Sequence, residues 1–376
     1  MPPLPLPDPL PLPAPAWLLA VLLVTTFAAH TVPMNLLLGG AIIGAVAHLR
    51  GRRDGMSAVL ALWIARLTPF LVAATVTFGV ATLLFLQVLY GRVFFATAVL
   101  LAVPWLAIVP ALVVAYYSSY WNAARSDASR VGGWAPAPWV SWLVAALVMG
   151  VALVQSNVMS LMLRPQVLGV WFQAGASGLR LNLADPSLVP RFLHTVVGAV
   201  AVAGVAVAVG GHLLRDRDGT ASAWMIRHGV LWATVATTVN LLPGFWWLAT
   251  LPPATLARFM GRDIVATFCL AGGVLGALAA VGHLIPAAFA ARPRPLLAGG
   301  AGSLATSVLL MVGVRDIVRR AALRSAGFEV TAWVAPQLGA IALFGLLLAG
   351  GVVAIVWLIR TAARPPRLGH RASECR

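Results

Sequence analysis

Lysine is absent from this sequence, and acidic residues are scarce. All 26 basic residues are therefore arginine, and with 10 Asp and Glu residues the formal net charge is +16. Only 10% of the residues are charged, whereas a soluble domain carries about a quarter. This composition excludes an ordinary soluble domain. Because the arginines flank apolar runs, we interpret the positive charge as contact with the head groups of a lipid bilayer, not as nucleic-acid binding.

Carboxylates are also missing from the interior of the apolar runs. All ten lie in expected loops, tails or the ends of spans: Asp8, Asp54, Asp127, Asp185, Asp216, Asp218, Asp263, Asp316, Glu329 and Glu374. Proton pumps and many ion-coupled transporters depend on carboxylates within the membrane. We therefore expect no proton coupling through the middle of this protein.

Cysteine is represented by Cys269 and Cys375 alone. They form no Cys-x-x-Cys-His motif, which excludes covalently attached c-type haem, and they imply no disulfide framework. The segment 1–16 holds eight prolines and no basic residue. It lacks the positive leader of a secretory signal, so we predict a Pro-rich tail in the polyproline II conformation.

Hydrophobic residues make up 61% of the chain, and the mean hydropathy is +0.93. They recur in runs of about 20 residues, the length that crosses a bilayer as a helix. The sequence predicts an all-α, polytopic transmembrane bundle in one membrane domain over 17–361, followed by a basic tail over 362–376. About nine spans are expected: roughly 17–46, 68–90, 94–118, 138–160, 190–213, 228–250, 264–290, 297–315 and 336–360.

The arginines are distributed unequally between the two sides of this bundle. Sixteen of the 26 fall in alternate connections and the C-terminal tail, and ten fall on the other side. Because positive residues favour the cytoplasmic side, we expect the N-terminus outside and the C-terminus in the cytoplasm. With these helices, the chain is expected in a membrane that it crosses several times.

Most of the seven histidines have an ordinary explanation. His48, His212 and His228 lie at cytoplasmic span ends beside arginine, where their rings are expected to reach water. His283 is expected to form a hydrogen bond to a neighbouring helix, and His370 lies in the tail.

His30 and His194 are the histidines expected to bind a ligand. His30 lies near the middle of the first span and is followed by Pro33, which frees backbone carbonyls and opens a pocket. His194 opens the fifth span, and Gly198, four residues later on the same face, leaves room for a flat ligand. An ionisable side chain within a membrane span is costly, so the default hypothesis is a functional one. We interpret these residues as parts of a haem site.

These features together resemble subunit I of the cytochrome bd-type quinol oxidases. Members of that family have nine spans and an outside N-terminus. The segment from Phe27 through His30 to Gly40 is similar to the family's first span with its haem-ligating histidine. Gly79-Val80-Ala81-Thr82, with Gln87 and Tyr90-Gly91 following, resembles the motif Gly-Val-Ala-Thr, four residues, Glu, two residues, Phe-Gly. Phe192-Leu193-His194-Thr195 resembles the Phe-x-His-Thr context of the low-spin haem histidine.

Several family features are missing. The motif glutamate is Gln87, which cannot carry a proton. The outside loop between spans six and seven, associated with quinol oxidation, has shrunk to about a dozen residues around Arg258. The Gly-Arg-Gln-Pro-Trp signature is reduced to Pro336-Gln337, and span eight has no glutamate. For the axial methionine, Met260 is the nearest match in sequence, and Met311 is a geometric alternative at the depth of His194.

The resemblance implies one or two b-type haems, with ligands among His30, His194, Met260 and Met311. Gly198 and Gln87 would lie beside the cofactor, and Arg191, Arg315 or Arg319 would pair with propionates. It also implies an electron-transfer subunit, not an oxygen reductase, that connects a quinone near Asn240, Trp246 and Trp247 with a partner subunit or an outside cytochrome. Two alternatives stay open: a non-haem anchor or scaffold subunit of a larger complex, and a small-molecule transporter.

Overall fold

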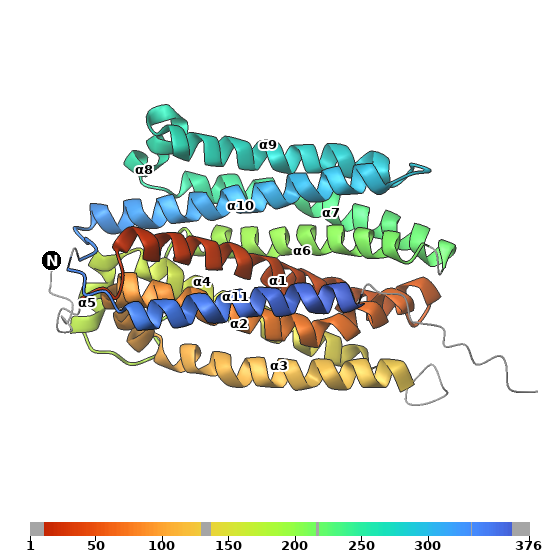
Figure 1. Cartoon of the computed structure of the whole chain (residues 1–376), viewed down its shortest axis with the longest axis horizontal. Helices are drawn as coiled ribbons and strands as arrows, with labels where there is room; N and C mark the ends of the chain where they lie inside the picture. The colour runs from red at the N-terminus through yellow and green to blue at the C-terminus, as the bar shows by residue number, and fades with distance from the viewer. Residues whose placement is uncertain (1–10, 129–136, 216–217, 332, 363–376) are drawn as a thin grey trace, which may run out of the picture.

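The computed structural model describes residues 11–128, 137–215, 218–331 and 333–362. In this part of the chain nine long helices run side by side along the long axis of the molecule (Figure 1). They are α1 (Ala16–Arg50), α2 (Gly55–Leu100), α3 (Ala102–Ala128), α4 (Pro138–Met162), α6 (Leu188–Leu213), α7 (Gly219–Ala249), α9 (Ile264–Ala287), α10 (Arg294–Ser325) and α11 (Leu338–Ala362). The predicted all-α fold is confirmed. Each long helix overlaps one expected span, except α2, which covers the second span and the beginning of the third.

Seven of the described helices are long and apolar enough to cross a membrane, which supports a multi-pass membrane protein. α7 is not among the seven. Its membrane-length stretch carries three threonines and an asparagine: Thr234, Thr237, Thr238 and Asn240. Polar side chains of this kind are tolerated inside a bundle when they face its interior. Two of them, Thr237 and Asn240, line the cavity described below.

Short helical segments lie at one end of the bundle. They are α5 (Pro165–Gln173), α8 (Pro253–Ala257) and the π-helical turn η2 (Arg258–Arg262). α5 and α8 lie at the same end in Figure 1, which we call the α8 end. Both occupy connections that the distribution of arginines assigned to the outer side of the membrane.

α2 differs most from its expected span. It begins at Gly55, not near 68, because the Asp54 carboxylate caps it by accepting hydrogen bonds from the backbone N–H groups of Met56 and Ser57. The connection expected at 91–93 was wrong. The helix continues to Leu100 and is only kinked at Tyr90, where φ is −129° and ψ is 25°.

The described residues of the Pro-rich segment pack against the fold. Leu12 and Ala14 are buried. The Leu12 N–H donates to the Trp333 carbonyl at 2.9 Å, and the Ala335 N–H donates to the Leu12 carbonyl at 2.9 Å. This pairing fixes the segment that leads into α11. The expected tail from 363 onward lies outside the described residues.

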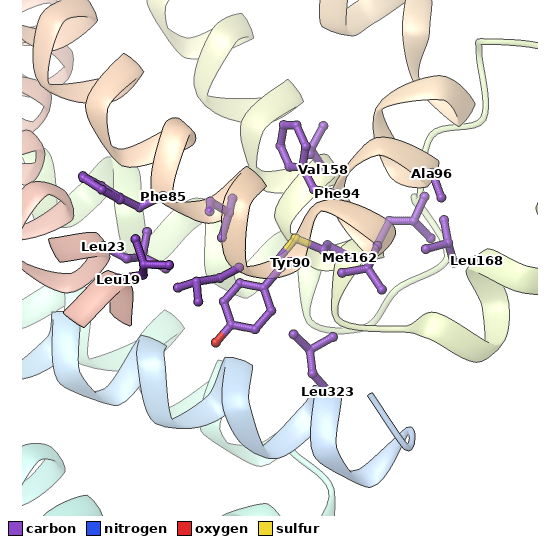
Figure 2. Packing of buried hydrophobic residues seen from close by; sticks show 14 of the residues in the cluster. Leu19, Leu23, Phe85, Tyr90, Phe94, Ala96, Val158, Met162, Leu168 and Leu323 are labelled. Carbon is purple, nitrogen blue, oxygen red and sulfur yellow. The ribbon is translucent and has the colours of Figure 1, made fainter. Parts of the chain in front are cut away.

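A hydrophobic cluster fills the α8 end, with side chains from α1, α2, α4, α5 and α10 (Figure 2). Tyr90 occupies the kink of α2, and its hydroxyl points toward α10 (Figure 2). Its ring pairs with Phe328 at a centroid distance of 6.0 Å. The guanidinium carbon of Arg319 lies 5.2 Å from the same ring. The kinked α2 is thus packed against α10, the helix that carries Met311 and Arg315.

Small residues bring the central helices close together. A Cβ on Gly39 of α1 would lie 2.0 Å from the Ala199 carbonyl oxygen of α6, and one on Gly204 would lie 2.5 Å from the Ala233 nitrogen of α7. Helices in a bilayer associate by such close packing, because lipid offers no hydrophobic driving force between them. The contacts set the spacing of three helices that surround the main cavity.

Candidate cofactor site

A cavity of about 160 Å³ lies between α1, α6, α7, α9 and α10. Its lining runs from Thr237 to Leu248 on α7, about 16 Å along the helix axis at 1.5 Å per residue. Most of the wall is apolar. The polar or titratable lining residues are Thr31, Asn35, His194, Thr195, Thr237, Asn240, Trp247, Ser307 and Arg315. The cavity is therefore suited to an amphiphilic ligand.

His194 lines this cavity from the first turns of α6. Its Nδ1 lies 3.2 Å from the backbone carbonyl oxygen of Asn240. Because a carbonyl only accepts, this hydrogen bond requires a proton on Nδ1 and leaves Nε2 as the nitrogen with a free lone pair. A metal-ligating imidazole is usually held in this way. Gly244 packs against the ring, since a Cβ there would lie 3.1 Å from two of its atoms.

The structure places the two candidate methionines differently. Met311 of α10 lines the same cavity as His194. Met260 lies in η2, is 58% exposed, and is not among the residues that line the cavity. The turn around Met260 is fixed by Gly261, with φ of 103°, and by the 2.5 Å ion pair between Arg258 and Asp263. Only Met311 is therefore brought together with His194.

Two half-buried arginines accompany these residues. Arg315 lines the cavity and donates from Nη2 to the Thr195 hydroxyl at 2.8 Å. Its guanidinium carbon lies 5.7 Å from the Phe27 ring centroid. The guanidinium carbon of Arg191 lies 5.5 Å from the Trp247 ring centroid. Among the described residues, neither guanidinium has a carboxylate within ion-pair distance, so both can pair with an anionic ligand.

Several buried polar atoms at this site have no protein partner. Asn240 Oδ1, Thr237 Oγ1 and Trp247 Nε1 belong to residues that line the cavity, whereas Arg191 Nε belongs to a residue that packs on Trp247 and is not among those that line it. A buried polar atom without a partner costs about 1–3 kcal/mol. Together with the imidazole, the thioether and the unpaired cations, these atoms fit a flat, partly anionic metal complex such as haem.

Gly198 lines the cavity, as expected from its spacing to His194. The space that a Cβ would occupy is bordered by Asn240, whose amide nitrogen would lie 3.0 Å away. Gly198 thus gives room to an amide of α7 as well as to the cavity. The glycine that touches the His194 ring is Gly244, which the sequence argument missed because the contact joins two helices.

His30 is held by the same arrangement in the first half of the chain. Its Nδ1 lies 3.0 Å from the Thr75 carbonyl oxygen, and a Cβ on Gly79 would lie 3.0 Å from its ring. The same offset in the sequence, within one residue, separates His194 from His30, Asn240 from Thr75 and Gly244 from Gly79. The helix pairs α1–α2 and α6–α7 therefore each hold an imidazole with a free Nε2. His30 itself is not among the residues that line the main cavity.

The other candidate positions have separate environments. Gln87 lies on α2 and does not line the cavity. His48 does not reach water as expected, since it is only 6% exposed and its Nδ1 lies 2.6 Å from the Ser141 hydroxyl. His283 bonds the Ala279 carbonyl of its own helix at 2.7 Å, not that of a neighbour. Within the described ranges, no three His, Cys, Asp or Glu side chains converge on a metal-ion site.

Comparison with known proteins identifies the fold. No protein-family model matches the chain, and no curated protein sequence matches it. Among solved structures, the chain is similar to the bd oxidase from Geobacillus thermodenitrificans, with a TM-score of 0.71 and 14% sequence identity. The match covers 95% of this chain and 100% of that chain. The chain has a bd-oxidase-like fold. The resemblance noted in the sequence is confirmed at this level.

Proposed function

We propose that this chain is a membrane b-type cytochrome-like electron-transfer subunit, a divergent relative of bd-type quinol oxidase subunit I that is not itself an oxygen reductase. One observation carries the proposal. His194, with its Nδ1 bonded to the Asn240 carbonyl, lines the same cavity as Met311, which carries a second soft iron ligand. Haem b bound there would supply one-electron redox chemistry, with a potential raised by methionine ligation.

Other residues of this chain have separate roles in the proposed site. The Asn240 carbonyl fixes the tautomer and orientation of His194, so that Nε2 is the ligand atom. Gly273 leaves the space in which the end of the Met311 side chain lies. Arg315 and Arg191 provide positive charge for propionates, and the apolar wall from α9 and α10 excludes water. Gly198 borders the cofactor. Met260, on its exposed turn, takes no part in ligation.

A second haem at His30 is supported by the arrangement that it shares with His194. Both rings have an Nδ1 partner on the next helix and a glycine against the ring face. With Gln87 in place of a glutamate and no mid-span carboxylate, the proposed site transfers electrons without conducting protons. The partners are a quinone in the bilayer near Trp246 and Trp247, and a partner subunit or an outside-facing cytochrome.

The proposed location is a bacterial cytoplasmic membrane, with the α8 end outside. Nine spans, an outside N-terminus and a cytoplasmic C-terminus follow from the distribution of arginines. Under this orientation the haem at His194 lies near the outer face.

Pyridine haemochrome analysis of the purified full-length protein tests the proposal. We expect bound haem b in the wild type. Visible spectra of the same samples, recorded without pyridine, should show loss of the low-spin spectrum in His194→Ala. His30→Ala separates a second haem from the first by lowering the haem content without removing that spectrum. His283→Ala is the matched control, because that ring bonds only its own helix in the described structure, and it should leave the spectrum unchanged. A folded, colourless wild-type protein would reject the redox proposal and favour an anchor subunit.

A further inference from the structure

A second, much smaller cavity lies among α1, α2, α3 and α4, away from the proposed haem site. Its volume is about 20 Å³, and it shares no lining residue with the main cavity. The wall is built mainly of small apolar residues. Four of its residues are polar: Thr68, Ser119, Asn122 and Ser141. Each of the four is at most 7% exposed, so the polar side chains of the wall are shielded from bulk solvent.

A chain of hydrogen bonds forms part of this wall. The Nδ1 atom of His48 lies 2.6 Å from the Ser141 hydroxyl oxygen. The same oxygen accepts a hydrogen bond from Asn122 Nδ2 at 2.9 Å. These contacts join α1, α4 and α3 through buried groups.

The groups that face this cavity are hydrogen-bond acceptors. The Ser119 hydroxyl donates its proton to the Tyr116 carbonyl at 2.7 Å, and the Thr68 hydroxyl donates to the Ile64 carbonyl at 2.8 Å. Both oxygens therefore offer only lone pairs to a ligand. Asn122 Oδ1 is also an acceptor, is buried, and has no donor among the described residues.

We propose that this cavity is a binding site for one water molecule, which donates hydrogen bonds to Asn122 Oδ1 and to the hydroxyl oxygen of Ser119 or Thr68. A water needs roughly 10–15 Å³ of such volume and two to four polar partners. The cavity meets both conditions, whereas a larger ligand does not fit. A cation would require a desolvated charge without a carboxylate, and no Asp or Glu lines the cavity.

The bound water completes a link between α2, α3, α4 and α1. It satisfies the Asn122 amide and thereby holds the helices that surround His48 in register. This site does not depend on haem, because its residues lie in the first four long helices alone.

A high-resolution cryo-EM map of the full-length protein in lipid nanodiscs tests the proposal. We expect one peak at about 2.6–3.2 Å from Asn122 Oδ1, present equally in buffers free of sodium and ammonium. Ala65→Ser places a hydroxyl on the cavity wall and should displace the peak while the protein stays folded. Ala58→Ser, on an exposed position of the same helix, should keep it.

Two results would overturn the assignment. One is an empty cavity in a map that resolves other ordered waters. The other is a peak that appears only when sodium or ammonium is added, which would make the site a cation site. Asn122→Leu serves as a second test, because it removes the main acceptor and should abolish the peak. If that variant fails to fold, the pair Ala65→Ser and Ala58→Ser still decides.

Discussion

Met311 of α10 and Gly273 of α9 fit together across the contact between their helices. A Cβ on Gly273 would lie 2.0 Å from the Met311 terminal methyl carbon, Cε. Real Cβ atoms do not approach carbon this closely. The Met311 side chain can therefore take this position only because residue 273 has no side chain. The proposed methionine ligand is thus positioned by a residue without a side chain, whose carbonyl also accepts a hydrogen bond from the Ser307 hydroxyl of α10 at 2.7 Å.

Gly273→Ala should therefore disturb the proposed iron ligation without removing the methionine. The added methyl group displaces the Met311 side chain, so we expect a weaker reduced α-band and a lower reduction potential. Visible spectroscopy and a redox titration of the purified protein measure both. Gly282→Ala is the matched control, because a Cβ at that position of α9 meets nothing within 4 Å. Identical spectra for the two variants would argue against Met311 as a ligand.

Arg315→Leu removes a half-buried cation from the wall of the main cavity. A positive charge stabilises the reduced form of a nearby iron, so its loss should lower the reduction potential. An interaction of roughly 1–2 kcal/mol corresponds to about 40–90 mV for one electron. Arg315→Lys should retain most of the potential. Arg262→Leu, on an exposed position of η2, should change it little; an equal shift in that variant would contradict a local effect of Arg315.

The long connection before α6 is anchored by Asn182, which is fully buried. Its side chain donates to the Ser160 hydroxyl at 3.0 Å and to the Asp185 carboxylate at 3.1 Å. Asn182→Leu leaves these buried groups unpaired, and we expect a loss of about 2–4 kcal/mol in stability. Thermal unfolding and limited proteolysis of the connection would report it. Ser177→Ala, on an exposed residue of the same connection, should behave as wild type.

Acidification should weaken the turn that precedes α9. The hydrogen bond from Arg258 lowers the pKa of the Asp263 carboxyl, with further help from the backbone N–H of Ala266. A lowered folded-state pKa means that this contribution is fully present above the unfolded pKa, about 3.9. It is lost as the pH falls through the folded-state value. Thermal unfolding between pH 6 and 3 should show a smaller pH effect in Asp263→Asn, which keeps an acceptor for the cap. An unchanged pH profile would contradict this.

The sequence allowed most of the helices to be predicted, because apolar runs of membrane length have few other solutions. The predicted end of the second span was wrong for a physical reason. Gly91 and Arg92 read as a loop, but the helix absorbs them with a kink at Tyr90, and the packing that holds the kink comes from α10. Contacts between distant helices leave no local signal in the sequence.

The candidate site was predictable in its imidazoles but not in its assembly. His30 and His194 stood out because titratable residues are rare in spans. The partners that orient them are backbone carbonyls of Thr75 and Asn240, which any residue could supply. The choice between Met260 and Met311 depends on which helix faces the cavity. Which helix faces the cavity is set by tertiary packing. Motif order in the sequence pointed instead to Met260.

The pairing of Leu12 with Trp333 and Ala335 joins opposite ends of the described chain. A contact between residues so far apart in the sequence contributes no stabilisation until the intervening helices are in place. We therefore expect it to form late in folding. Until then, the backbone groups on either side remain open to pairing with another strand. The attachment of the segment that leads into α11 is therefore expected late in the assembly of this bundle.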